Sequence, residues 1–156
     1  MTRRLAVALA AAACLTGVLA PPALAVTPKR GSYAGKSDQR DVPSNRVELR
    51  VDRHHKVVRF AIDWTAKCGK PDTFWDAGTQ VKDPKNDPIG TFHDHGSYSS
   101  KTDDGFKGRV TLTVDGHFTD KKHARGSWKA TVKVYNPHGK RVDTCTTKTH
   151  WKVGPA

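Results

Sequence analysis

Basic residues recur at alternate positions in several segments of this sequence, with apolar residues between them. Side chains at alternate positions of a β-strand share one face, so we expect these cations to point toward solvent. Such a surface attracts anionic polymers with an affinity that falls as salt rises. The alternative is that the cations provide solubility and discourage strand edges from pairing. The candidate anion-binding residues are Arg59, Lys67, Lys107, Arg109, Lys129, Lys133, Lys148 and Lys152.

The segment His93-Asp94-His95 is a second candidate site. Its two imidazoles stand at positions i and i+2, so on a strand both would face a single Zn²⁺ or Cu²⁺ ion. A metal site needs a third or fourth ligand, and no further residue stands at a diagnostic spacing. His93 and His95 are therefore candidate metal ligands, with plain surface histidines as the alternative.

Linear motifs of catalysis are missing from the sequence. It contains no nucleophile elbow, no glycine-rich phosphate loop and no two-histidine zinc helix. Asp103 and Asp104 are adjacent, so their carboxylates would face opposite ways in an extended chain. We therefore expect a protein that is not an enzyme and that uses no cofactor.

Residues 1–25 have the organisation of a secretory signal peptide. Arg3 and Arg4 precede an apolar run over positions 5–20, and Ala23-Leu24-Ala25 supplies the small residues of a cleavage site. The run is shorter than the roughly 20 residues of a transmembrane helix. Cleavage would leave residues 26–156 as a single β domain. We expect this domain to be monomeric and either secreted or associated with the cell envelope.

The charge of the chain is strongly positive. Lysine and arginine number 27 against 15 aspartate and glutamate residues, a formal net charge of +12. Residues 1–25 contain two of these arginines and no acid, so their removal leaves a net charge of +10. Such a charge predicts salt-sensitive adhesion to polyanions.

The clearest strand pattern covers positions 58–68, where Phe60, Ile62 and Trp64 alternate with polar residues and Val58 is expected to begin the buried face. Similar alternation occurs at 47–51, 106–114, 128–134 and 142–153. Positions 69–88 and 96–105 are expected to be irregular. Asp115-Gly116 is the residue pair most typical of a hairpin turn. Together these features predict an all-β antiparallel meander of eight or nine strands, closed as a small barrel or packed as a two-layer sandwich.

Two cysteines, Cys68 and Cys145, remain after residues 1–25 are removed. An even number of cysteines in a small exported domain indicates a disulfide, and two cysteines allow one pairing. A catalytic cysteine would need a free thiol. We therefore expect the Cys68–Cys145 bond to link the end of the clearest strand to the last strand.

Several short motifs resemble those of a group of small exported β-rich proteins of high-GC Gram-positive bacteria. The resemblance covers nearly all of the chain after residue 25. It implies export, a β fold and a disulfide, and it implies nothing about chemistry. The motifs are Gly31-x-Tyr33-x-Gly35-Lys36, Gly105-Phe106-x-Gly108, Gly116-x-Phe118, Ala124-x-Gly126, and Val142-Asp143-Thr144-Cys145 before Trp151.

Wall teichoic acids, phospholipid headgroups and extracellular DNA are the polyanions nearest to an exported protein of such bacteria. We therefore expect a non-enzymatic binder of anionic cell-envelope polymers that uses a basic strand surface. Sequence-specific binding of nucleic acid is not expected, because no groove-reading element is predicted. The alternative is a carrier of a small ligand or metal, with its site at one end of a β-barrel.

Overall fold

The structure is a computed structural model that describes residues 26–40, 42–87 and 90–156; the predicted signal peptide, 1–25, lies outside the described residues. The described residues form antiparallel strands and no helix, which confirms the all-β prediction. The nine strands are β1 (Gly31–Ser37), β2 (Arg46–Val51), β3 (Val57–Cys68), β4 (Phe74–Lys82), β5 (Lys85–Asp87), β6 (Thr91–Lys101), β7 (Lys107–Phe118), β8 (Ala124–Tyr135) and β9 (Arg141–Pro155).

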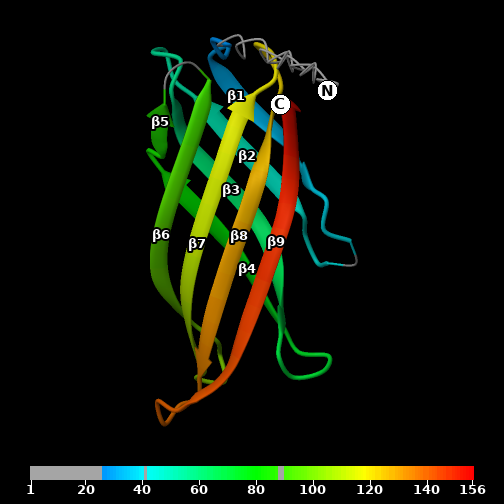
Figure 1. Ribbon diagram of the computed structural model, residues 1–156, viewed down its shortest axis with the longest axis vertical. Coiled ribbons are helices and arrows are strands. Elements are labelled where there is room, and N and C mark those ends of the chain that lie inside the picture. Colours follow the sequence, from blue (N-terminus) through cyan, green and yellow to red (C-terminus); the bar gives the residue numbers. More distant parts are fainter. Residues whose placement is uncertain (1–25, 41, 88–89) are drawn as a thin grey trace, which may run out of the picture.

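All nine strands belong to one sheet with the order β4-β3-β2-β1-β9-β8-β7-β6-β5. The sheet folds over on itself, so that β6 to β9 run nearly upright in front of β1 to β4, which cross behind them obliquely (Figure 1). The strands β4 and β5 stand at the two ends of the order. In the described part of the chain they do not pair with each other. The two-layer alternative fits this arrangement.

Strand β9 pairs with strands of both layers. It pairs with β1 from Ser37↔Trp151 to Tyr33↔Pro155, and with β3 at Lys67↔Thr146 and Cys68↔Cys145. Between these two ladders, Asp38 and Gln39, which follow β1, form the hydrogen bonds that a further strand would form. The Asp38 N–H donates to the His150 carbonyl at 2.9 Å. The Gln39 side-chain amide donates to the Thr65 carbonyl at 2.7 Å and accepts from the Thr65 N–H at 3.2 Å.

The predicted disulfide is present between the two layers. Cys68 and Cys145 are directly opposite each other in the β3–β9 ladder, and both side chains are buried. They are separated by 77 positions in the sequence. The bond therefore holds the two layers together at the point where they share β9.

The core between the layers is an aromatic cluster. The Phe60 ring lies 5.1 Å from that of Trp151 and 6.2 Å from that of Trp128, and the Trp64 and Trp128 rings are 6.0 Å apart. All four side chains are at most 1 % exposed. Burial of an aromatic side chain is worth roughly 2–3 kcal/mol, so this cluster supplies a large part of the stability. The burial of Phe60, Ile62 and Trp64 confirms the predicted inner face of β3.

Two facing glycines make room for this core. Gly116 and Gly126 are paired across β7 and β8, between Phe92 of β6 and Trp151 of β9. A Cβ at Gly116 would lie 2.4 Å from the Phe92 ring, and one at Gly126 would lie 2.4 Å from the Trp151 ring. Both distances are far below van der Waals contact, so only glycine fits.

This packing corrects the predicted hairpin turn at Asp115-Gly116. Strand β7 continues through both residues to Phe118, because Gly116 is needed under the Phe92 ring. The turn lies at positions 119–123. There the Asp120 carboxylate accepts hydrogen bonds from the N–H groups of Lys122 at 2.7 Å and His123 at 2.9 Å.

Two segments predicted to be irregular are strands. In β4, Trp75 is buried with its ring against Gly108 of β7. In β6, the Tyr98 hydroxyl lies 2.7 Å from the Thr79 hydroxyl of β4. These contacts between distant segments outweigh the weak local strand preference.

The predicted start of the buried face at Val58 is also wrong. The register of β2 with β3 shifts after Arg50, so Val57 is buried in place of Val58. A β-bulge of this kind moves a side chain to the other face of its strand.

We predict that the double variant Cys68→Ser with Cys145→Ser is folded but much less stable. The chain-entropy model assigns at most about 4–5 kcal/mol to a bond that closes 77 residues. This corresponds to a fall in melting temperature of about 10–20 °C. Thermal unfolding followed by circular dichroism, with and without reductant, measures the effect. A variant that melts within about 2 °C of the wild type would contradict it.

Candidate anion-binding face

Register places basic side chains opposite each other on the outer face of β7, β8 and β9. Lys129 faces Lys148 across β8 and β9, and Arg109 faces Lys133 across β7 and β8. A third pair, Arg125 and Lys152, lies farther along β8 and β9. We call seven outward cations of these three strands the basic face; Arg141, at the start of β9, is not included. They are Lys107, Arg109, Arg125, Lys129, Lys133, Lys148 and Lys152, of which all but the half-buried Lys107 are exposed.

Within the described part of the chain, the cations of the basic face form no close ion pairs. In the described residues, no member of the basic face has a carboxylate oxygen within 4.0 Å. The outer face of the other layer also has a row of cations, Arg50, Arg59 and Lys82, but it contains ion pairs. There Arg46 lies 3.4 Å from Glu48 and 3.5 Å from Asp63. Like charges directly opposite in a sheet are destabilising, so the basic face costs the fold stability.

Most of the residues predicted to bind anions belong to this face. Lys67 of β3 joins its margin, because it is paired with Thr146 of β9. Arg59 does not join it. Its side chain lies on the other layer, opposite Arg50, and forms an ion pair with Glu48 at 3.8 Å.

A small hollow lies beside Arg109 on the basic face. The Arg109 guanidinium stacks over the Tyr135 ring, 5.1 Å from its centre, which restricts its direction. The hollow has a volume of about 420 Å³, and Lys133, Ser97 and Thr111 also line it. Two cations and neighbouring hydroxyl donors are suited to an oxyanion such as a phosphate group.

The structure places His93 and His95 on one face of β6, beside the basic face. The His93 Nδ1 lies 2.7 Å from the Asp87 carboxylate, and the His95 Nδ1 lies 3.2 Å from the Thr113 hydroxyl. No cluster of three or more metal-ligating side chains occurs within 26–40, 42–87 and 90–156. The two residues thus have no third ligand in that part of the chain, and metal binding stays a prediction.

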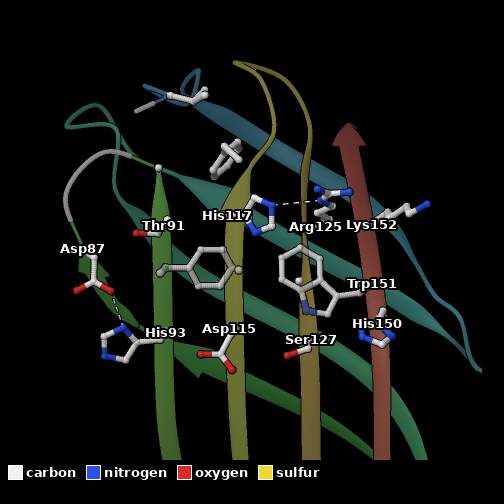
Figure 2. A pocket seen from close by; sticks show the side chains of 16 residues that line it. Asp87, Thr91, His93, Asp115, His117, Arg125, Ser127, His150, Trp151 and Lys152 are labelled. Atoms are coloured by element: carbon white, nitrogen blue, oxygen red, sulfur yellow. Dashed lines mark hydrogen bonds and ion pairs between the residues drawn. The ribbon is translucent and has the colours of Figure 1, made fainter. Parts of the chain in front are cut away.

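A larger hollow, of about 990 Å³, lies at the upper end of the same face (Figure 2). We call it the histidine hollow. Two rows of outward side chains cross it from β6 to β9. One row is His93, Asp115, Ser127 and His150; the other is Thr91, His117, Arg125 and Lys152.

Asp38 lies beside His150, one of the residues that line this hollow. Its carboxylate accepts hydrogen bonds from the Thr149 hydroxyl and from the His150 N–H at 2.9 Å, and it lies 3.3 Å from the His150 Nδ1. The bond from Thr149, together with those from His150, holds the pKa of Asp38 below its usual range. The contact orients the His150 imidazole at the edge of β9.

The sequence analysis missed several residues of this region. Arg125 was not expected on a strand, because the alternation was read from Trp128 onward. Its position, four residues before Lys129 and eight before Lys133, has the same phase and could have indicated it. Asp115 was missed because a turn was expected at Asp115-Gly116.

Comparisons with protein-family models, curated proteins and solved structures gave no match. The resemblance to small exported β-rich proteins therefore stays a prediction. A disulfide is compatible with an exported protein. Among the described residues, no helix is long and apolar enough to cross a membrane.

Lys148→Glu is predicted to stabilise the fold. It converts a like-charge pair with Lys129 into an opposite-charge pair, which raises the free energy of unfolding by about 0.5–1 kcal/mol at low salt. Urea unfolding at low and high salt measures the gain, which should shrink as salt rises. Lys140→Glu, the same charge change in the turn before β9, is the control and should have little effect. A Lys148→Glu protein less stable than the wild type would rule out strain from like charges.

Asp38→Asn is predicted to make the free energy of unfolding fall less steeply as the pH drops below neutral. Because folding lowers the pKa of Asp38, the ionised carboxylate stabilises the fold above its usual pKa. That contribution is lost as pH falls through the lowered pKa. The side chain is 59 % exposed, so the variant should lose less than about 1 kcal/mol at neutral pH. Urea unfolding at about pH 7 and pH 3 tests this; equal losses at both would contradict it.

Proposed function

We propose that this protein is an exported, monomeric, non-enzymatic binder of anionic cell-envelope polymers, and that the basic face is its binding surface. The observation that carries the proposal is the set of three like-charged cross-strand pairs without carboxylate partners in the described residues. Cations that served only solubility would gain stability from interspersed acids, such as Glu48 and Asp63 beside Arg46 on the opposite layer.

The spacing of the pairs suits an extended polymer. Arg125, Lys129 and Lys133 follow one another at intervals of four residues along β8. At about 3.3 Å per residue, they are spaced about 13 Å apart. Each contact with an exposed cation is weak. A polymer that lies along the strands would meet several at once and would relieve their mutual repulsion.

Among polyanions, we favour the phosphodiester polymers of a Gram-positive wall, the teichoic acids. The face is built of flexible lysines beside Ser97, Thr111 and other hydroxyl groups, which suits isolated phosphate groups along a flexible chain. Single-stranded nucleic acid is less suitable, because its bases bind by stacking on exposed aromatic side chains. In the described residues, Phe74 is the one large hydrophobic side chain that is exposed. The predicted export and the resemblance described above support the same location.

The test is co-sedimentation of the mature protein with purified cell wall, with and without teichoic acid, across a salt series. We expect binding that requires teichoic acid. With about four phosphate contacts, the affinity should fall roughly 30- to 100-fold between 50 and 200 mM salt, by analogy with single-stranded nucleic acid. Binding to teichoic-acid-free wall, DNA or anionic vesicles with equal strength would contradict this choice of polymer.

Paired variants locate the surface. Lys129→Gln with Lys148→Gln should weaken binding and reduce the salt slope by about 1.4, because two phosphate contacts are lost. The matched control, Arg50→Gln with Lys82→Gln, removes the same charge from the outer face of the other layer. Equal losses in the two variants would show that net charge alone, rather than the basic face, determines binding.

A further inference from the structure

Three histidines surround the histidine hollow, and each is already oriented by a hydrogen-bond partner. The His93 Nδ1 lies 2.7 Å from the Asp87 carboxylate, and the His150 Nδ1 lies 3.3 Å from that of Asp38. The third, His117, accepts a hydrogen bond at its Nε2 from the Arg125 Nε, 3.2 Å away. This last bond requires His117 to be unprotonated at Nε2. Figure 2 shows the His93 and His117 contacts as dashed lines.

The balance of charge around the hollow depends on these imidazoles. Among the side chains that line the hollow, Arg125 and Lys152 are permanent cations, and Asp87 and Asp115 are carboxylates. With neutral histidines the formal charge of this lining is 0, and with all three protonated it is +3. Histidine is the side chain whose charge ordinarily changes between about pH 8 and pH 5. Protonation of the three imidazoles therefore turns a neutral hollow into a cationic one.

We propose that the histidine hollow is a second anion subsite that takes phosphate groups of the same polymer when the medium is mildly acidic. This inference rests on the proposed function, because the hollow continues the basic face beyond Lys129 and Lys148. At neutral pH the outward row with Asp115 interrupts the line of cations between Lys129 and Arg125. When His93 and His150, at the two ends of that row, are protonated, the row itself carries positive charge.

Protonation also changes what Arg125 can bind. A protonated His117 carries a proton on Nε2 and repels the guanidinium that now donates to it. Arg125 is released from this contact and can turn toward a phosphate oxygen, as can His117 itself. On its other side Arg125 faces Lys152 of β9, a cation that attracts the same anion. The hollow gains donors as well as charge.

The groups that face each imidazole are part of the same balance. Lys85 of β5 stands directly opposite His93, Asp87 of β5 lies 2.7 Å from its Nδ1, and Asp115 of β7 faces it from the other side. His95 follows it on β6. His117 faces Arg125 and follows Asp115 on β7, while His150 faces Asp38 and stands between Lys148 and Lys152.

The test measures the affinity for soluble poly(glycerol phosphate) at about pH 8 and about pH 5.5, at constant ionic strength. This probe is a phosphodiester, so its own charge stays constant over the interval. Wild-type protein should bind about tenfold more tightly at the lower pH, since three exposed charge pairs add up to that order. The triple variant His93→Gln, His117→Gln, His150→Gln should keep the affinity at pH 8 and lose the increase. His138→Gln, in the turn before β9, is the control and should keep it.

Asp115→Asn tests whether the charge of the hollow controls the affinity, without a histidine substitution. It removes one carboxylate from the hollow, so its affinity at about pH 8 should move toward the wild-type value at about pH 5.5. A triple variant that keeps the full increase would overturn the inference, and so would an Asp115→Asn protein that binds more weakly than the wild type. Weak binding at pH 8 in every protein, with a histidine-dependent increase at pH 5.5, would instead contradict the proposed function alone.

Discussion

The arrangement of β9 between the two layers is the constraint on which the rest of the structure depends. One end of β9 pairs with β1, and the other pairs with β3 and carries the Cys68–Cys145 bond. Gln39 fills the space between these two ladders. With β9 held from both sides and Trp151 packed on Phe60, its register with β8 cannot slip without exposing the core.

That register determines the surface. Because Trp128 and Trp151 must point inward, Lys129, Lys148 and Lys152 must point outward. Antiparallel pairing then brings Lys129 opposite Lys148 and Arg125 opposite Lys152, so the backbone register alone determines these like-charge pairs. The resulting repulsion is a cost that the aromatic core and the disulfide offset. A fold that tolerates such a surface is consistent with a face that is neutralised by a ligand.

The sequence predicted those parts of the fold that local alternation determines. The burial of Phe60, Ile62 and Trp64 and the outward direction of Lys129 and Lys133 follow from a period of two, and the disulfide follows from a count of two cysteines. Contacts between distant segments determine the rest. Nothing near Gly116 indicates that the Phe92 ring lies against it, and nothing near Asp38 indicates a hydrogen bond to His150, 112 positions away. The histidine hollow depends on the pairing of β6, β7, β8 and β9 side by side, which local alternation does not reveal.

The most direct test of the account is to map where a polyanion touches the protein. Titration of ¹⁵N-labelled mature protein with poly(glycerol phosphate), followed by amide chemical shifts, reports this without any substitution. The account predicts that the changes at about pH 8 concentrate on β7, β8 and β9 around Lys129, Lys133 and Lys148, and that they vanish at high salt. Changes centred on the outer face of β2 and β3 around Arg59, or spread evenly over both layers, would contradict it.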